Sequence, residues 1–348
     1  MKRIYITLMS LGLLVNANAQ DFHFAQSSQT PLFINPAAAG VFDGWERITI
    51  NHRNQWLGAS TQFMTTAIGA DINLFKSDYN PKAHMGVGLM FFNDVGGDSR
   101  FGNQTGALTI SGIIPLGAGG HILSVGVQGA LGSRKADLSN VTFMTQWDNS
   151  TSTFNPLIAS GENNGLTSFM YMDVSAGIYY TFDGGKNSFA RDNDFKLKIG
   201  VAGFHLNMPE LQYVSGSADR LYRKYVAHVG FSTDFSGRPL AMEANAIQFI
   251  QGGHYETLFG LMMKYRFESA TKITGNNQDA FVGLGLSMRW GDAIIPAVSV
   301  EWKGFQLGIS YDITISELRK AYGGGSLEFS LAYTNLDHSL FKVKRRKF

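Results

Sequence analysis

The strongest constraint on the fold is an alternation of apolar with polar or small residues that recurs along the chain. In FQLGISYDITIS, at 305–316, every second residue is apolar and every intervening one is polar or glycine. Successive side chains of a strand point to opposite sides of a sheet, so such a strand has one wholly apolar face. The same division recurs at 170–182, 282–290 and 327–334. The chain is therefore predicted to be all-β.

The length of these runs favours a membrane-spanning barrel over a soluble sandwich. Each run is about ten residues long, which is the length that a tilted strand needs to cross a bilayer. Strands of soluble proteins are usually about five or six residues long, and the outer faces of a sandwich are not usually so rich in glycine, of which this chain has 40. We therefore expect a transmembrane antiparallel β-barrel of the outer-membrane type. Counting the runs predicts about 14 strands, at residues 45–55, 62–74, 83–92, 103–115, 121–132, 169–182, 195–206, 222–234, 240–250, 256–267, 280–290, 292–302, 304–315 and 325–334.

The first residues have the parts of an export signal. Lys2 and Arg3 precede an apolar run at 4–15, and ANA at 17–19 supplies the small residues that a signal peptidase recognises. Residues 1–19 are therefore predicted to be a signal peptide. The absence of cysteine excludes a lipoprotein anchor and a disulfide framework.

Charge and connection lengths suggest how the rest of the chain is organised. Residues 1–19 contain two of the 29 Lys+Arg and none of the 27 Asp+Glu, which leaves 27 of each sign, so nothing favours nucleic acid as a partner. The predicted parts are an N-terminal plug or strap at 20–44, the barrel at 45–334 and a basic C-terminal tail at 335–348. If the N-terminus is periplasmic, the long fifth connection, at 133–168, faces the cell exterior.

Four tryptophans fall at predicted strand ends, namely Trp45, Trp56, Trp290 and Trp302. Indole rings prefer the interface between membrane and water, so we expect these residues to mark the two edges of the bilayer. Ordinary aromatic packing is the alternative.

No catalytic or metal-binding motif is recognisable. The eight histidines are scattered, without the spacing of a zinc site, and neither a nucleophile elbow nor a P-loop is present. We therefore expect no enzyme activity, no cofactor and no metal, although a Ser/His pair inside a barrel is recognised only by geometry. Asn93, Asp94 and Asp98 in the third connection could hold calcium, but without its ligand spacing a solvated loop is the simpler interpretation.

Three charged residues fall on strand faces that are predicted to line the lumen, namely Asp173, Arg289 and Asp312. A charge at mid-depth on the lipid face costs about 2–4 kcal/mol, so we expect these side chains to point into a polar lumen. Structural pairing is the simpler interpretation, and selection of a solute is the functional alternative.

A set of segments follows in order along the chain: LFINPAAAG at 32–40, NHRNQW at 51–56, MDVSAGIYY at 172–180, VAGFHLNMPE at 201–210, LYRKYVAHVGF at 221–231, LGISYDITISEL at 307–318 and GSLEFSLAY at 325–333. This set resembles the PorP/SprF family, outer-membrane proteins of the type IX secretion system of Bacteroidota. The family-like motif residues are Asn51, Arg53, Asn54, Gln55, Trp56, Arg223, Lys224 and Tyr225. His52 departs from the aromatic residue that is common in the family, and the tail lacks the cysteine that many members carry.

The resemblance implies a barrel that works with secreted proteins. Members of the family are needed for export or surface display of particular cargo, often adhesins with a type B C-terminal sorting domain. Some contribute to gliding motility or bind a periplasmic partner that anchors to peptidoglycan. An outer-membrane channel for small or hydrophobic solutes is the alternative function, because alternation and export fit it equally well.

The segment before the first strand is a candidate plug. Its residues Leu32, Phe33, Ile34, Asn35 and Pro36 precede a run of small residues, so the chain can bend closely against other backbone. We expect residues 21–44 to enter the lumen from the periplasmic side and occlude it. A periplasmic strap that orders the first strand is the alternative.

The candidate cargo-binding surface is the long loop at 133–168, because loops on a rigid barrel are free to carry recognition. Its apolar residues are candidate anchors, although they could instead fold the loop onto itself. They include Phe143, Trp147, Phe154 and Leu157. The basic tail could contact an anionic partner or simply be solvated, and its cations are Lys342, Lys344, Arg345, Arg346 and Lys347.

Overall fold

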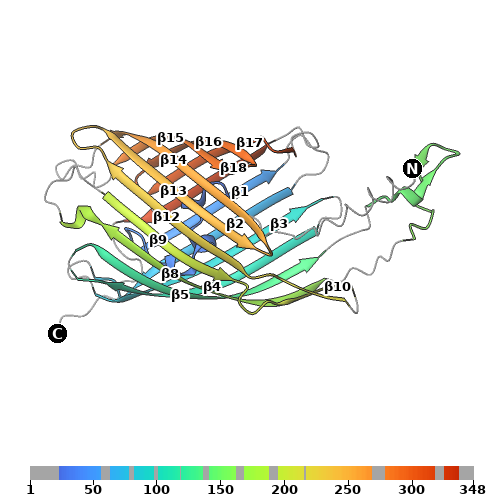
Figure 1. Cartoon of the computed structure of the whole chain (residues 1–348), viewed down its shortest axis with the longest axis horizontal. Coiled ribbons are helices and arrows are strands. Elements are labelled where there is room, and N and C mark those ends of the chain that lie inside the picture. The colour runs from blue at the N-terminus through green and yellow to red at the C-terminus, as the bar shows by residue number, and fades with distance from the viewer. Residues whose placement is uncertain are drawn as a thin grey trace, which may run out of the picture.

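Fourteen antiparallel strands close into one barrel, seen from the side in Figure 1. The computed structural model describes residues 23–55, 63–77, 82–97, 101–117, 119–135, 141–161, 168–187, 195–214, 217–268, 279–317 and 325–336. The barrel strands are β1 (Glu46–Gln55), β2 (Phe63–Leu74), β3 (His84–Gly96), β4 (Phe101–Pro115), β5 (His121–Lys135), β8 (Phe169–Asp183), β9 (Phe195–Phe204), β12 (Lys224–Asp234), β13 (Leu240–Gln251), β14 (His254–Glu268), β15 (Ala280–Arg289), β16 (Ala293–Trp302), β17 (Phe305–Thr314) and β18 (Ser326–Asn335).

The first and last strands join to close the barrel. Glu46 of β1 pairs with Asn335 of β18, and Gln55 pairs with Ser326. Closure satisfies backbone hydrogen bonds that an open sheet would leave exposed to lipid. The predicted all-β barrel of about 14 strands is thus confirmed. One boundary shifts, because Asn335, which the sequence assigns to the tail, is the last residue of β18.

Alternation decides which face of each strand meets lipid. On β17, Leu307 and Ile309 are exposed on the outside, whereas Ser310 and Asp312 are buried on the inside. The other barrel strands repeat this pattern of exposed apolar and buried polar or small residues. The outer surface is therefore apolar and the inner surface polar, as in outer-membrane barrels.

Two short hairpins lie in connections that the sequence treats as irregular. One consists of β6 (Trp147–Asp148) and β7 (Thr153–Phe154), and the other of β10 (Glu210–Val214) and β11 (Ser217–Arg220). Both are too short to show a measurable alternation, so a pattern search misses them. The β6–β7 hairpin stands beyond one end of the barrel in Figure 1. We refer to this end, where β5 stops and β8 starts, as the loop end, and to the opposite end as the turn end.

The segment before β1 lies inside the barrel, where Figure 1 shows it in blue between the front and rear walls. It contains the short helices η1 (Ser27–Gln29), α2 (Pro31–Ile34) and η2 (Pro36–Ala38), and η2 contacts β4, β5 and β8. Two other 3-10 turns, η3 (Met144–Gln146) and η4 (Gly184–Asn187), lie in connections. In the part of the chain described above, no helix is long and apolar enough to cross a membrane.

The tryptophans divide between the barrel surface and its interior. Trp290 and Trp302 are exposed near the loop end and the turn end of their strands, which agrees with a girdle at each interface. Trp45 is buried, and its amide donates a hydrogen bond to the carbonyl oxygen of Asn335. The prediction that Trp45 faces the interface is therefore wrong, because this residue immediately precedes β1 and is buried within the protein instead of lying on the outer face. Trp56 lies outside the described residues.

Candidate functional site

The inner segment, defined here as residues 23–44, runs lengthways through the lumen. At the loop end, the carbonyl oxygen of His23 accepts a 2.6 Å hydrogen bond from Arg53 near the end of β1. At the turn end, the amide of Gly40 donates to Asp71, which in turn binds Arg47 at the start of β1. The segment therefore joins β1 at the turn end, and its described part extends from there toward the loop end.

Leu32, Phe33 and Ile34 lie against the inner wall, as the plug hypothesis expects. Leu32 is buried beside Met90 and the small residues of β2 to β4. Ile34 packs in a cluster with residues of β9, β12, β13, β14 and β16 on the other side. The ring of Phe33 lies 6.1 Å from that of Phe92. Because the segment contacts opposite walls, it fills the middle of the lumen rather than lining one side.

Asn35 and Pro36 rest on a surface that we name the glycine floor, formed by Gly126 of β5, Gly177 of β8 and Gly200 of β9. Any Cβ added at these glycines would lie 2.1–2.7 Å from atoms of residues 35–37 or His228. Such distances are too short for a real side chain, so only glycine lets the segment approach this closely. The glycine-rich inner face thus follows from what occupies the lumen.

The side chain of Asn35 fixes the turn to the floor. It is fully buried, and its Nδ2 donates to the carbonyl oxygens of Ile178 (2.9 Å) and Val201 (3.3 Å). Its Oδ1 accepts the amide of Ala37 at 2.9 Å, which caps the 3-10 turn that follows. Pro36 is at the first position of that turn, where a missing N–H costs nothing.

A buried carboxylate holds the other end of the segment. Glu328 of β18 accepts hydrogen bonds from the amides of Ala25 and Gln26, both at 2.8 Å. Ser330 adds a 2.6 Å hydrogen bond to the Gln26 side chain. Nothing in the sequence singled out Glu328, because its partners lie 302 and 303 residues away. The only feature of the sequence that could have indicated this role is that Glu328 lies on the inward face of a predicted strand.

The predicted lumen charges all face inward, and two of them meet. Asp312 binds Arg289 at 2.8 Å and Arg53 at 3.0 Å, and all three side chains are buried. Asp173 lies apart from them and pairs with His205 at 2.9 Å. This placement agrees with the structural-pairing alternative, because each charge has a protein partner. The sequence does not predict that Arg53 joins this pair, although Arg53 belongs to the family-like motif NHRNQW at 51–56.

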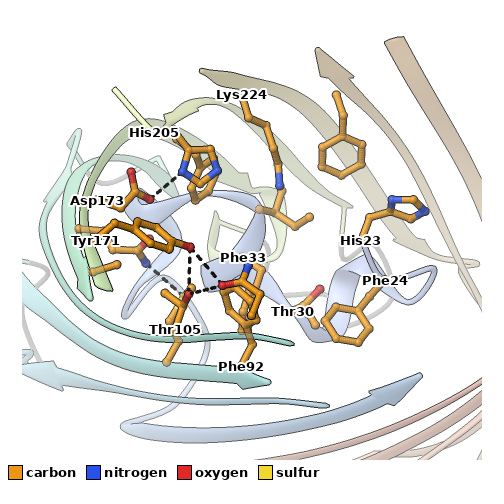
Figure 2. Close-up of a pocket in the computed structure, with 17 residues that line it drawn as sticks. His23, Phe24, Thr30, Phe33, Phe92, Thr105, Tyr171, Asp173, His205 and Lys224 are labelled. Carbon is orange, nitrogen blue, oxygen red and sulfur yellow. Dashed lines mark hydrogen bonds and ion pairs between the residues drawn. The ribbon is translucent and has the colours of Figure 1, made fainter. Parts of the chain in front are cut away.

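A cavity of about 50 Å³ lies on the loop side of the inner segment. Figure 2 shows its lining, with Phe24 and Phe33 of the inner segment facing Phe92, Tyr171, His205 and Lys224 of the wall. The hydroxyl of Tyr171 donates to Asn103 at 3.2 Å. Lys224 lies over the rings of Phe204 and Phe249, with its Nζ 5.4 and 5.7 Å from their centroids. The cavity is therefore mainly apolar, with polar groups at its edge.

A second cavity, of about 360 Å³, lies on the turn side of the inner segment. Lys264 bridges Glu243 and Glu301 across its wall, at 2.5 Å each. Lys198 and His228 also line it. The inner segment thus separates two chambers that differ in character, one small and apolar and one larger and charged.

The remaining family-like residues take different positions. Asn51 is buried in the lumen, and Asn54 and Gln55 are partly buried at the loop end of β1. Arg223 is exposed, and its Nε donates to the carbonyl oxygen of Leu206 at 3.2 Å. Tyr225 is exposed on the outer face. These residues therefore do not form one site.

The long loop carries exposed aromatics in its hairpin. The rings of Trp147 and Phe154 pack edge to face with centroids 5.0 Å apart, and both residues keep exposed surface. Leu157 is almost fully exposed, and Phe143 is half-buried. The loop thus folds onto itself through the Trp147–Phe154 pair and still has exposed apolar surface.

The hairpin turn is ordered by an acidic residue. Ser150 donates its hydroxyl and its amide to the carboxylate of Asp148, and these hydrogen bonds lower the pKa of Asp148. The carboxylate is therefore ionised at neutral pH, and the turn keeps these two bonds.

The calcium hypothesis receives no support from the placement of its residues. Asn93 and Asp94 are part of β3 rather than of a loop, since β3 continues to Gly96. Thr65 donates to Asp94 at 2.6 Å, and Gln104 donates to Asn93 at 2.9 Å. Asp98 lies outside the described residues, and among those that are described no cluster of His, Asp and Glu could hold a metal. The signal peptide and the cations of the tail also lie outside them.

A family model matches most of the chain. The family is described as type IX secretion system membrane protein PorP/SprF, and the match covers residues 16–333. No curated protein matches the sequence significantly.

Several solved structures are similar in shape but not in sequence. The toluene transporter TbuX of Ralstonia pickettii is 11% identical with a TM-score of 0.47, and the alignment covers 89% of this chain and 94% of TbuX. A FadL homologue of Pseudomonas aeruginosa is 10% identical with a TM-score of 0.41, over 89% and 94% of the two chains. The translocator domain of the autotransporter NalP from Neisseria meningitidis is 9% identical with a TM-score of 0.36, over 89% and 96%. At such scores the likeness carries no inference about function.

Proposed function

The chain belongs to the PorP/SprF family of type IX secretion system membrane proteins, and from this membership we propose that it binds, helps to export or displays at the cell surface one specific secreted protein. The protein is located in the outer membrane and has other secretion components as partners. The proposed cargo is a secreted protein such as an adhesin with a type B C-terminal sorting domain. The proposed role is binding and involves no enzymatic step.

The filled lumen is the observation that carries this proposal. The inner segment contacts opposite walls through Leu32 and Ile34, and its Asn35 turn rests on the glycine floor. Among the described residues, this close packing places protein in the middle of the lumen, where a porin has a water-filled channel. A barrel without an open path offers its loops and rim to partners, and these are surfaces on which a protein can be recognised.

The β6–β7 hairpin is the proposed cargo-binding surface. Trp147 and Phe154 form a preassembled aromatic pair that remains exposed. Rigid aromatic side chains are frequent anchors of protein interfaces, because they bury a large area at a small cost in conformational entropy. Phe143 and Leu157 flank the pair in sequence and are further candidate anchors.

Further roles are proposed for other parts of the chain. The basic tail, with Lys342 and Arg345 among its cations, would contact a periplasmic partner that anchors to peptidoglycan, through attraction to acidic groups. Display of an adhesin would also support gliding motility in a cell that glides.

A channel for small or hydrophobic solutes is the second candidate function. One observation favours it, namely the mainly apolar cavity at the loop end, with Phe33, Phe92 and Phe249 in its lining. Such pockets bind small apolar ligands. In a channel, the inner segment would act as a gate.

Deletion of the gene separates the two functions. Surface-attached and released proteins would be compared by quantitative mass spectrometry in three strains, namely the parent strain, the deletion strain and the deletion strain complemented with the gene. Selective loss or shedding of one large protein with a C-terminal sorting domain supports the cargo function and names the cargo. An unchanged protein profile would refute it and favour the channel.

The hairpin is then tested by substitution. Trp147→Ala with Phe154→Ala should reduce cargo capture by at least about 30-fold, because even one hot-spot aromatic contributes about 2 kcal/mol or more. Asn149→Ala changes an exposed residue of the same hairpin turn and should leave capture intact. Equal capture by all variants would exclude the hairpin as the cargo-binding surface.

A further inference from the structure

The Asn35 side chain, which fixes the inner segment to the glycine floor, also contacts a titratable side chain. Its Nδ2 lies 3.2 Å from Nε2 of His228, a residue on the inward face of β12. His228 is opposite Gly200 of the glycine floor, and a Cβ added at Gly200 would lie only 2.3 Å from the same Nε2. Histidine is the side chain whose charge ordinarily changes near neutral pH. The contact therefore connects the position of the segment to the binding of a proton.

The orientation of the Asn35 carboxamide is fixed by its other partners. Its Oδ1 accepts the amide of Ala37 at 2.9 Å, and its Nδ2 donates to the carbonyl oxygens of Ile178 and Val201. Rotating the carboxamide by half a turn would place two donors face to face at Ala37 and two acceptors face to face at each carbonyl. Nδ2 is therefore the atom that faces His228.

This orientation determines the protonation state of His228 in the docked segment. An amide NH2 group can only donate, so Nε2 of His228 must accept, and an accepting ring nitrogen carries no proton. The docked state thus requires the neutral ring with its hydrogen on Nδ1. A proton on Nε2 would occupy the lone pair that Asn35 uses and would place N–H groups against each other at 3.2 Å. The proton and the inner segment therefore compete for one lone pair.

The groups around His228 do not compensate an added positive charge. The ring of Tyr179 on β8 lies 5.3 Å from the ring of His228. Lys198 of β9 is diagonally opposite His228, because the register pairs Lys198 with Gly230. Among the residues that the structure describes, no carboxylate forms an ion pair with His228. The other charged side chains that line the larger, turn-side chamber are Arg47 of β1, Glu243 of β13, Lys264 of β14 and Glu301 of β16.

These other charges are engaged with protein partners. Lys264 binds both glutamates of the chamber, and Arg47 binds Asp71 at 2.7 Å. A proton on His228 would therefore add a positive charge beside Lys198 while the segment is docked. Once the contact with Asn35 is broken, both ring nitrogens can donate to water in the chamber that His228 lines. The protonated ring thus favours the undocked segment.

We propose that Asn35 and His228 form a pH-sensitive switch, in which the neutral imidazole holds the inner segment on the glycine floor and the protonated imidazole releases it. Release would remove the wall between the apolar and the charged chamber, because Asn35 is the fully buried residue that fixes the turn between them. The switch would operate whether the barrel recognises a secreted protein or conducts a solute.

The sign and size of the effect follow from proton linkage. The docked state binds one proton fewer than the undocked state, so docking is complete while His228 is neutral and weakens as the pH falls. An imidazole in water titrates near pH 6.5. Between about pH 7.5 and about pH 5, the undocked population should therefore rise by up to about 30-fold.

Nitrogen-15 NMR of the histidine rings tests the protonation state in the full-length protein. The chain has eight histidines, and the signals of His228 are identified by their absence in His228→Gln. At neutral pH we expect a neutral ring with its hydrogen on Nδ1, and we expect the second proton to appear in the pH range in which the segment is released. A hydrogen on Nε2 at neutral pH would overturn the proposal.

Thiol labelling tests the release. Ala39→Cys places a single thiol at a fully buried position of the segment, and its reaction with an impermeant maleimide is followed at both pH values. Each rate is divided by that of an Asp219→Cys variant, whose thiol is at an exposed position, because the reactivity of a thiol itself depends on pH. We expect this ratio to rise by up to about 30-fold at the lower pH.

Two substitutions separate the switch from a general effect of acid. His228→Gln supplies an amide oxygen that can accept from Asn35 but takes up no proton in this pH range, so the segment should stay docked at both pH values. His52→Gln is the matched control, because Nδ1 of His52 lies 2.9 Å from the hydroxyl of Thr66 and not beside the inner segment. This control should respond to pH as wild type does.

The outcomes decide whether His228 is the switch. If His228→Gln releases the segment at the lower pH as wild type does, another group binds the proton and the proposal is wrong. An unchanged labelling ratio in wild type would also overturn it. If heat-modifiable migration in detergent gels shows that His228→Gln does not form the barrel, Asn35→Ala decides. Its segment should label rapidly with the same ratio at both pH values, and a remaining pH dependence would refute the switch.

Discussion

The contact between the inner segment and the glycine floor can be tested with a single added carbon atom. Gly126→Ala places a Cβ 2.6 Å from the backbone N and Cα of Ala37. The matched control is Gly129→Ala on the same strand, whose added Cβ has nothing within 4 Å. Both changes should be tolerated by the strand itself, because alanine has less conformational entropy to lose than glycine.

The size of the effect follows from the geometry. To reach the ordinary contact distance of 3.4 Å from 2.6 Å, the segment must move by about 0.8 Å. Closely packed interiors do not absorb such a shift, and overpacking costs about 1–3 kcal/mol. The atoms in the way are main-chain atoms of the segment, so rotation of a side chain cannot relieve the contact. We therefore expect the undocked population of the segment to rise about 5- to 150-fold.

Two measurements follow the undocked state. The chain has no cysteine, so Ala39→Cys provides a single thiol at a fully buried position of the segment. Its labelling rate by a membrane-impermeant maleimide reports how often the segment leaves the lumen wall. Planar-bilayer recordings of the same variants would count openings of the barrel.

The geometry predicts how the variants differ in labelling rate and in opening frequency. Gly126→Ala should label faster and open more often than wild type, and Gly129→Ala should match wild type. If the two glycine variants behave alike, the segment is not held by the floor, and the assignment of these glycines is wrong. If Gly126→Ala labels faster without opening more often, the segment moves but does not close a conducting path.

Two further predictions concern the lumen. Deletion of residues 22–40 should raise single-channel conductance, because it removes the part of the chain that packs between opposite walls, and an unchanged conductance would instead support a strap. Asp312→Asn should lower the free energy of unfolding by about 3–5 kcal/mol, because Arg53 and Arg289 would remain buried with less negative charge nearby. The exposed change Asp219→Asn should have no effect, and both would be measured by the temperature at which the barrel loses its folded migration.

The barrel fold was predictable because the pattern that specifies each strand is contained within that strand's own sequence. Each barrel strand must present apolar side chains to lipid, and a strand shows this requirement within about ten residues. The ends of strands were less predictable. β3 continues to Gly96 and β5 to Lys135, past the predicted ends, because strands can extend beyond the membrane, where the apolar pattern is no longer required.

The contacts of the inner segment were predictable only in part. That Leu32 and Ile34 face a wall follows from their apolar character. That Glu328 would accept two amides of the segment does not, because this pairing depends on which strand closes against β1. Trp45 shows the opposite error, since an indole at a strand end has the same sequence signal whether it faces lipid or the interior.

The glycine floor connects the composition of the chain to the state of its lumen. A water-filled lumen requires polar side chains, whereas a lumen occupied by main chain requires that side chains be absent where the two backbones meet. Gly126, Gly177 and Gly200 belong to strands that are adjacent in the barrel but separated in sequence by the long loop and other connections. Inward glycines on successive strands, together with a short segment of Asn, Pro and Ala before the first strand, therefore predict a filled barrel. In such a barrel the surfaces left accessible to a partner are the loops at the rim, and the aromatic hairpin of β6 and β7 is one of them.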